Sequence, residues 1–305
     1  MKTSRLTLTC ILLTFVAALP AIAGPRIFVS GLGNDANPGT REQPKRTFAS
    51  ALTVTDPGGE IIVLDSAGYA STTLTIDKPI SIIAPSGLYA GVRIASGTAI
   101  KITAGVNDIV VLRGLSITGP GGGGGGTGIN LTAAGAVHIE NCVISGFRSS
   151  NPSVPGHGIL CAGARKIFIK DTIARENFNG IYATAGMLSI DRVRLEGNQQ
   201  NGLRIGAGVK AVIGHSVASG NFFGLVADGS GAELSMEDLT AAHNEYAGIS
   251  IQTGALGRLS NSTVINNGGG VLLSQSSAFL ESRQNNTVRG NGTNSNSPPT
   301  PISGF

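Results

Sequence analysis

The stretch that decides the fold runs from residue 177 to residue 273, where one short pattern occurs five times. It reads N-F-N-G-I-Y-A (177–183), N-Q-Q-N-G-L-R-I (198–205), N-F-F-G-L-V-A (221–227), N-E-Y-A-G-I-S-I (244–251) and N-G-G-G-V-L-L (267–273). Over a longer window its glycine stands at positions 128, 158, 180, 202, 224, 248, 270 and 292, with spacings of 30, 22, 22, 22, 24, 22 and 22 residues. A fixed period of this length is typical of a solenoid, in which each repeat packs only on its neighbours.

Each repeat holds three short β-rich runs, as in residues 180–183, 188–190 and 193–195. Two columns in the first run are aliphatic or small. They are Ile129, Ile159, Ile181, Leu203, Leu225, Ile249 and Val271, and then Leu131, Cys161, Ala183, Ile205, Ala227, Ile251 and Leu273. Because side chains alternate between the two faces of a strand, both columns are expected to point inward. The pattern predicts an all-β chain folded as a parallel β-helix with one strand of each sheet per coil and about 22 residues per coil.

Two further columns fall at turns. One is Asn141, Asp171, the Asp191-Arg192 pair, His215, Asp238 and Asn261; the other is Asn177, Asn198, Asn221, Asn244 and Asn267. Asn and Asp tolerate left-handed backbone and bond to their own chain. We therefore interpret both columns as architectural, with the first at the corner between the second and third strands.

The ends of the chain differ from the repeat. Residues 1–23 have the basic start, apolar centre and small residues of a signal peptide, with cleavage near Ala23. Residues 24–60 are expected to form an N-terminal cap and first strand, which cover an open edge of the β-helix. The β-helix itself is assigned to residues 61–292, and residues 293–305, rich in Asn, Ser and Pro, are expected to form a loose tail.

Composition excludes several classes of protein. Charged residues make up only 13% of the 305 residues, where about 25% is usual, and this excludes a coiled coil or a helical bundle. The 45 glycines have no three-residue period, which excludes collagen. Without Lys2 and Arg5 the net charge falls from +4 to +2, because 20 basic residues face 18 acidic ones, and the basic residues form no runs. A nucleic-acid partner and a membrane span in the mature chain are therefore not expected, and the chain is predicted to be secreted or periplasmic.

Two cysteines, Cys142 and Cys161, remain after cleavage. A disulfide is open to them in an oxidising compartment, but two cysteines are not a disulfide framework. Their apolar neighbours favour small buried core residues.

The opening V-S-x-x-G-N-D-x-N-P-G-T (29–40), the following P-x-x-T-F-x-x-A (44–51) and the repeated N-x-x-(x)-G-[ILV] resemble the bacterial right-handed parallel β-helix proteins of the pectate-lyase-like (pectin lyase fold) superfamily. The resemblance covers nearly all of the mature chain. It implies a right-handed β-helix but no single function, since that superfamily includes lyases, hydrolases, epimerases, esterases and adhesins. The leucine-rich repeat has a similar period, and residues 190–198 fit it, but the other coils do not keep the leucines.

Catalytic motifs of the superfamily are incomplete. G-H-G-I at 156–159 and N-G-L-R-I at 201–205 resemble polygalacturonase segments, which implies that His157 and Arg204 contact substrate. An inverting glycosidase needs two carboxylates, whereas Glu140 is the only one between Gly114 and His157. Calcium takes 6–8 oxygen ligands, and the first-strand face offers Asp228 and little else. No cofactor is therefore expected, and Ca²⁺ stays open without support from the residues.

One surface constellation remains on the outward face of the first strands. Its candidate binding residues are Tyr182, Thr184, Arg204, Asp228, Ser250 and Gln252, with Asn179, Asn201 and His157 at the edge. A tyrosine ring can stack on a sugar, and a guanidinium fork matches a carboxylate. A solvated β face also favours such polar residues without any ligand.

Three functions stay open on this evidence. The first is binding of an extended polysaccharide, neutral or acidic, on the first-strand face. The second is a polysaccharide lyase or related carbohydrate-active enzyme, in which Arg204 or Tyr182 would act as base and His157 is a weaker catalytic candidate. The third is a structural or adhesive solenoid without a discrete site. The sequence does not indicate the glycan or the oligomeric state.

Overall fold

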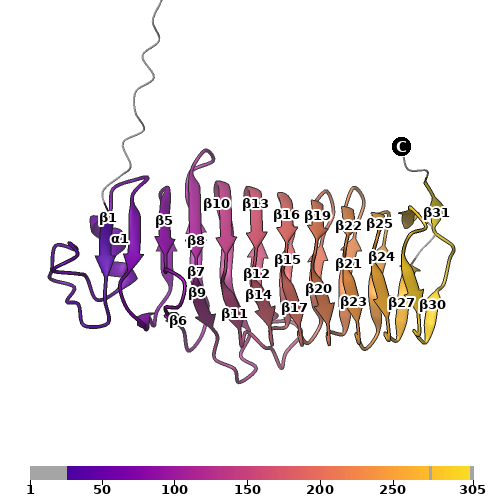
Figure 1. Cartoon of the computed structure of the whole chain (residues 1–305), viewed down its shortest axis with the longest axis horizontal. Helices are drawn as coiled ribbons and strands as arrows, with labels where there is room; N and C mark the ends of the chain where they lie inside the picture. Colours follow the sequence, from indigo (N-terminus) through magenta and orange to yellow (C-terminus); the bar gives the residue numbers. More distant parts are fainter. Residues whose placement is uncertain (1–25, 275–276, 303–305) are drawn as a thin grey trace, which may run out of the picture.

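The chain forms a stack of β coils, seen edge-on in Figure 1 from the N-terminal cap at one end to the last coil at the other. This computed structural model describes residues 26–274 and 277–302. The predicted signal peptide, residues 1–23, lies outside the described residues. Each coil contributes one short strand to each of three sheets, and each strand pairs in parallel with the strand of the preceding coil.

The first sheet carries the repeat glycine and the first β run of each coil. Its strands are β4 (Leu74–Ile76), β7 (Thr98–Thr103), the first half of β10 (Gly126–Glu140), β12 (Gly156–Cys161), β15 (Asn179–Ala183), β18 (Asn201–Ile205), β21 (Phe223–Asp228), β24 (Ala247–Gln252), β27 (Gly269–Ser274) and β30 (Thr293–Ser295).

The second sheet follows the first in each coil. Its strands are β1 (Arg26–Val29), β2 (Glu60–Val63), β5 (Ile80–Ile83), β8 (Ile109–Arg113), the second half of β10, β13 (Ala164–Lys170), β16 (Met187–Asp191), β19 (Lys210–Gly214), β22 (Glu233–Glu237), β25 (Leu256–Ser260), β28 (Phe279–Ser282) and β31 (Thr300–Pro301).

The third sheet is made of the shortest strands. They are β3 (Ala67–Ala70), β6 (Ala90–Arg93), β9 (Leu115–Thr118), β11 (Val143–Ser145), β14 (Ile173–Arg175), β17 (Arg194–Glu196), β20 (Val217–Ser219), β23 (Thr240–Ala242), β26 (Thr263–Ile265) and β29 (Thr287–Arg289).

The core is a set of stacked aliphatic columns, as the alternation predicts. Ile159 pairs with Ile181, Ile181 with Leu203, and the column continues to Val271, with every member at most 3% exposed. Coils in parallel register lie about 4.8 Å apart, so each buried side chain contacts its counterparts above and below. Burying one Ile or Leu contributes about 1.5–3 kcal/mol, and the sum along the columns stabilises the stack.

The repeat glycine is required by close approach between coils. A Cβ at Gly202 would lie 2.6 Å from the backbone oxygen of Gly224, and one at Gly180 equally close to that of Gly202. No side chain fits at this distance. The glycine period in the sequence therefore marks the positions where the backbones of neighbouring coils are in close contact.

The two turn columns are architectural, as predicted. At the corner after the second sheet, Asn141, Asp171, Arg192, His215, Asp238 and Asn261 all have positive φ, between 45° and 52°. Before the repeat glycine, the buried asparagines form a ladder. From Asn198 onward, each side chain accepts from the backbone and the Nδ2 of the asparagine one coil earlier, for instance from Asn198 Nδ2 to Asn221 Oδ1 at 2.9 Å.

The N-terminal cap contains the helix α1 (Phe48–Val54). Thr47 caps the helix, because its side chain accepts a hydrogen bond from the backbone nitrogen of Ser50. The helix residues Phe48, Ala51 and Leu52 are buried. The helix therefore covers the apolar end of the first coil. In the described part of the chain no helix is long and apolar enough to cross a membrane.

The C-terminal end corrects one expectation. Residues 293–302 do not form a loose tail, because β30 pairs with β27 and β31 pairs with β28. Main-chain pairing on an open sheet edge is available to polar residues, since it uses the backbone and not the side chains. Polar composition alone therefore does not mark the end of the solenoid.

Cys142 and Cys161 are both buried and both free thiols. Burial raises the pKa of Cys142 to about 11 and that of Cys161 to about 12. Thiols of this kind are unreactive core residues, in line with the interpretation from the sequence.

Candidate functional site

Strand pairing in the first sheet sets the outward column of the candidate site. Tyr182 pairs with Arg204, Arg204 with Val226, and Val226 with Ser250. Asp228 and Gln252 pair two residues further along the same strands. The sequence therefore placed these residues in the correct columns.

The centre of the site is an ion pair beside an aromatic ring. Arg204 donates from Nη2 to Asp228 Oδ2 at 2.6 Å, and its guanidinium carbon lies 5.8 Å from the centroid of the Tyr182 ring. The Arg204 and Asp228 side chains are 39% and 24% exposed. An exposed pair of this kind contributes about 0–1 kcal/mol to stability, so the guanidinium remains available to a ligand.

A buried polar row borders this centre. Asn201 Nδ2 donates to Asn179 Oδ1 at 2.7 Å, and Asn179 Nδ2 lies 3.2 Å from His157 Nδ1. All three residues are at most 6% exposed, although they come from three successive coils. The row fixes the His157 ring, whose centroid lies 5.3 Å from that of Tyr182.

His157 is neutral in this setting. Burial lowers its pKa from 6.5 to about 4, because the imidazolium would lose its hydration. Since Nδ1 accepts from the amide of Asn179, the neutral ring carries its proton on Nε2. The ring therefore offers one hydrogen-bond donor and no free base.

This pKa predicts a pH dependence of stability. The unfolded chain binds a proton at His157 below about pH 6.5, whereas the folded chain does so only near pH 4. We expect the free energy of unfolding to have its highest value above pH 6.5. It should fall by up to about 3 kcal/mol as the pH drops toward 4. His157→Asn would extend the asparagine row without a titrating group, and denaturant titrations at several pH values should show a smaller fall. An unchanged pH profile would contradict the burial of a neutral imidazole.

The remaining predicted residues of this face differ in exposure. Ser250 is only 2% exposed and its Oγ accepts from Gln252 Nε2 at 2.8 Å. The hydroxyl of Thr184 lies 3.4 Å from the backbone oxygen of Cys161. Ser250 therefore faces the outside of the sheet but is covered by its neighbours. Thr184 is exposed, and Tyr182, Arg204, Asp228 and Gln252 are partly exposed.

An aromatic cluster next to the site was missed from the sequence. Phe223 pairs with Asn201 and so continues the column of the buried polar row. Its ring lies 5.0 Å from Phe222 and 4.9 Å from Tyr246. The signal is in the repeat itself, because aromatic residues stand one or two positions before the glycine, whereas the predicted outward columns begin only after it.

Two loops border the first sheet near His157. Residues 121–126 and 147–156 are joined by hydrogen bonds from Gly125 N to Arg148 O and from Ser150 N to Gly123 O, both 2.8 Å. The backbone nitrogen of Ser149 also donates to Gln199 Oε1 at 2.8 Å. The two loops are thus joined to each other beside the strand that carries His157.

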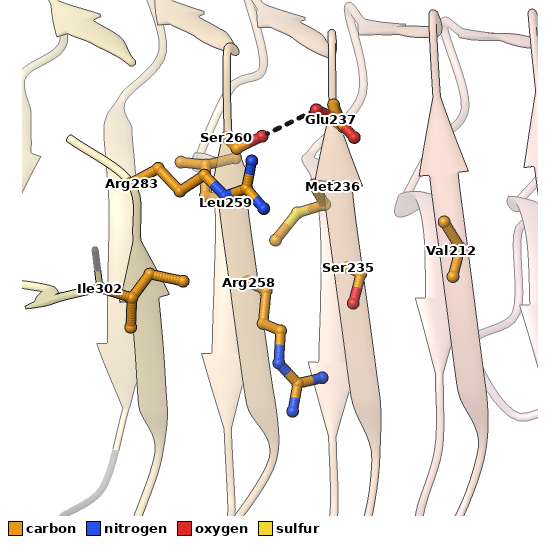
Figure 2. A pocket seen from close by; sticks show the side chains of 9 residues that line it. All are labelled: Val212, Ser235, Met236, Glu237, Arg258, Leu259, Ser260, Arg283 and Ile302. Carbon is orange, nitrogen blue, oxygen red and sulfur yellow. Dashed lines mark hydrogen bonds between the residues drawn. The ribbon is translucent and has the colours of Figure 1, made fainter. Parts of the chain in front are cut away.

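A separate pocket lies on the second sheet near the last coil (Figure 2). Arg258 at its rim is bonded to Glu233 at 3.1 Å and to Glu281 at 2.8 Å, and Ser260 is bonded to Glu237. Its floor is formed by buried Met236 and Leu259. No predicted site residue lines this pocket.

The chemistry of the site is that of a hydrogen-bonding surface with an aromatic face. Among the described strands of the first sheet, Asp228 carries the only carboxylate, and that carboxylate forms an ion pair with Arg204. Residues 26–274 and 277–302 hold no group of three or more histidine, cysteine or carboxylate side chains placed to share a metal ion. Donors, acceptors and a ring face suit a ligand that carries hydroxyl groups and apolar faces together.

Comparison with known proteins adds the fold family. Residues 157–299 match a family model described as a right handed beta helix region. The crystal structure of pectate lyase Pel9A is similar, with a TM-score of 0.69 and 17% identity, over 91% of this chain and 80% of that one. The complex structure of XylC with xylose has a TM-score of 0.63 and 9% identity, over 85% of this chain and 68% of that one. No curated protein sequence gives a significant match.

The three-sheet coil, the parallel register of its strands and these similarities agree. They show that the chain is a right-handed parallel β-helix protein with the pectin lyase fold.

Proposed function

We propose that this protein binds an extended polysaccharide along the outward face of the first sheet. The observation that carries the proposal is the placing of Arg204 between the Tyr182 ring and the Asp228 carboxylate, beside the neutral donor His157. The names of the two similar structures, a pectate lyase and a complex with xylose, support a carbohydrate as the ligand class.

Each exposed group has a role in this proposal. Tyr182 stacks on the apolar face of a sugar ring, Arg204 binds a carboxylate or hydroxyl oxygen, and Asp228 accepts from hydroxyl groups. His157 donates from Nε2 to the same ring. The chain of the ligand runs across successive coils, because the groups come from strands that are stacked along the solenoid axis.

A lyase is the alternative use of the same face, and the two differ in product. The Arg204 guanidinium donates to Asp228, which leaves the Tyr182 hydroxyl as the base candidate. Screening the purified protein against a panel of polysaccharides, with both binding and the ultraviolet absorbance of unsaturated products as readouts, separates the two. Binding without new absorbance supports the binding protein.

Secretion and independence from cofactors belong to the same proposal. We expect the protein to be exported to the periplasm or the medium and cleaved near Ala23, which mass spectrometry of the mature N-terminus would show. We also expect binding to be unchanged by a chelator. Loss of binding in EDTA that calcium restores would contradict the cofactor-free site.

The central prediction concerns Arg204. Arg204→Ala should weaken binding of an acidic polysaccharide by about 1.5–3 kcal/mol, the range for a hydrogen bond to a charged group, and added salt should weaken the wild type. Tyr182→Ala should weaken the binding of neutral and acidic polysaccharides alike, because stacking does not depend on charge. Calorimetry with one neutral and one acidic polysaccharide measures both effects.

Two further variants sharpen this test. Asp228→Asn removes the competitor for the guanidinium, so it should strengthen binding of acidic chains. Arg194→Ala is the matched control, since Arg194 is 61% exposed and bonded to Glu196 on the third sheet. Equal binding by the wild type, Arg204→Ala and Tyr182→Ala would place the site elsewhere. Absence of binding to every glycan would favour a structural solenoid.

A further inference from the structure

The aromatic cluster of Phe222, Phe223 and Tyr246 has a defined geometry. Tyr246 stacks on Phe222 with ring centroids 5.3 Å apart and an interplanar angle of 22°. Phe223 meets both rings at steeper angles, 81° to Phe222 and 59° to Tyr246. Tyr246 is 52% exposed, while both phenylalanines are partly buried. Two phenylalanines therefore support one outer tyrosine ring and hold its orientation.

The next coil leaves that tyrosine uncovered. In the register of the first sheet Ala247 pairs with Gly269, so Gly268 is the counterpart of Tyr246. The backbone nitrogen of Gly269 donates to Tyr246 O at 2.6 Å, and a Cβ at Gly268 would lie 2.3 Å from the backbone oxygen of Glu245. Close approach of the two coils excludes any side chain there. As a result, no ring among the described residues continues the aromatic stack on the far side of Tyr246.

The cluster continues the candidate site and is not a separate patch. Phe223 occupies the column of His157, Asn179 and Asn201. Tyr246 directly precedes β24 and stands four residues before Ser250, which continues the Tyr182 column three coils further on. At about 4.8 Å per coil, the two tyrosines are separated by roughly 14 Å along the solenoid axis.

We propose that Tyr246, supported by Phe222 and Phe223, is a second stacking position for a sugar ring of the same polysaccharide. This inference rests on the proposed function and extends it. An exposed ring with a fixed plane presents a flat apolar face, and a phenol adds a hydrogen-bonding edge, which together match the two faces of a pyranose. Arg204 lies one coil beyond Tyr182 in the direction of Tyr246 and binds polar groups of the intervening sugars.

The consequence is a dependence on ligand length. A disaccharide is too short to span roughly 14 Å and reach both rings, whereas a hexasaccharide can do so. Joining two weak positions through one ligand raises affinity because the second contact becomes intramolecular. Wild-type protein should therefore bind the hexasaccharide more tightly than the disaccharide.

The test uses Tyr246→Ala, Tyr246→Phe and Tyr182→Ala in calorimetry with the oligosaccharides of a polysaccharide that binds. Tyr246→Ala should lower hexasaccharide affinity about tenfold, and Tyr246→Phe should keep most of it because the ring remains. In Tyr182→Ala combined with Tyr246→Ala, the gain in affinity from disaccharide to hexasaccharide should disappear. Phe168→Ala, which removes a ring 37% exposed on the second sheet, is the matched control.

The outcomes separate the two proposals. If no glycan binds the wild type, the proposed function fails. If Tyr182→Ala weakens hexasaccharide binding and Tyr246→Ala does not, the face binds glycan but the second position is refuted. If Tyr246→Ala instead converts a dimer into a monomer in sedimentation experiments, a second copy of the chain covers the cluster and the inference is overturned.

Discussion

Ile181→Asp is expected to abolish the folded state of the central coils. Ile181 is 0% exposed and lies between Ile159 and Leu203 in a column of aliphatic side chains. Loss of its buried side chain costs about 2–5 kcal/mol, and a carboxylate there has no partner to offset its desolvation, which adds several kcal/mol more. The sum reaches the total stability of a typical domain, about 5–15 kcal/mol. We expect loss of the cooperative thermal transition in circular dichroism, together with rapid proteolysis.

Position and not charge is the cause, and a control can show this. Val212→Asp places the same carboxylate on β19, where the native side chain is 57% exposed, and should change stability by less than about 0.5 kcal/mol. Ile181→Val should cost about 0.5–1.5 kcal/mol. A folded, protease-resistant Ile181→Asp protein would mean that the column is not the core that its register implies.

Asn221→Ala is expected to cost about 4 kcal/mol, the second largest effect. Asn221 is 2% exposed, and its Oδ1 accepts from Asn198 N at 3.0 Å and from Asn198 Nδ2 at 2.9 Å. Its own Nδ2 donates to Leu195 O at 2.9 Å and to Asn244 Oδ1 at 3.0 Å. Truncation leaves several buried polar groups unpaired, at about 1–3 kcal/mol each. Denaturant titration measures the loss directly.

The exposed end of the same ladder supplies the control. Asn294 is exposed, and its Oδ1 accepts from Asn291 Nδ2 at 3.2 Å. Water can replace this partner, so Asn294→Ala should cost less than about 1 kcal/mol. Similar losses for both variants would show that the ladder contributes through its turn conformation and not through buried hydrogen bonds.

The candidate site was predictable to the level of columns. Because a parallel, in-register solenoid puts equivalent residues of successive coils side by side, the repeat alone placed Tyr182 next to Arg204 and His157 in line with Asn179. Whether those positions bind a ligand is a question that the repeat does not address, since a solvated face favours the same residue types.

What the sequence by itself determined is everything that repeats. The glycine period, the inward aliphatic columns and the asparagine columns specify three sheets, a stacked core and its corners, because each is a local pattern that the next coil copies. Only the tertiary structure decided what depends on contacts across coils. Such contacts cover Ser250, leave Tyr246 exposed beside Gly268 and add residues 293–302 to the last sheet edges. The physical reason is that exposure and pairing depend on the size of neighbouring side chains in space, whereas the direction of a side chain depends on strand period alone.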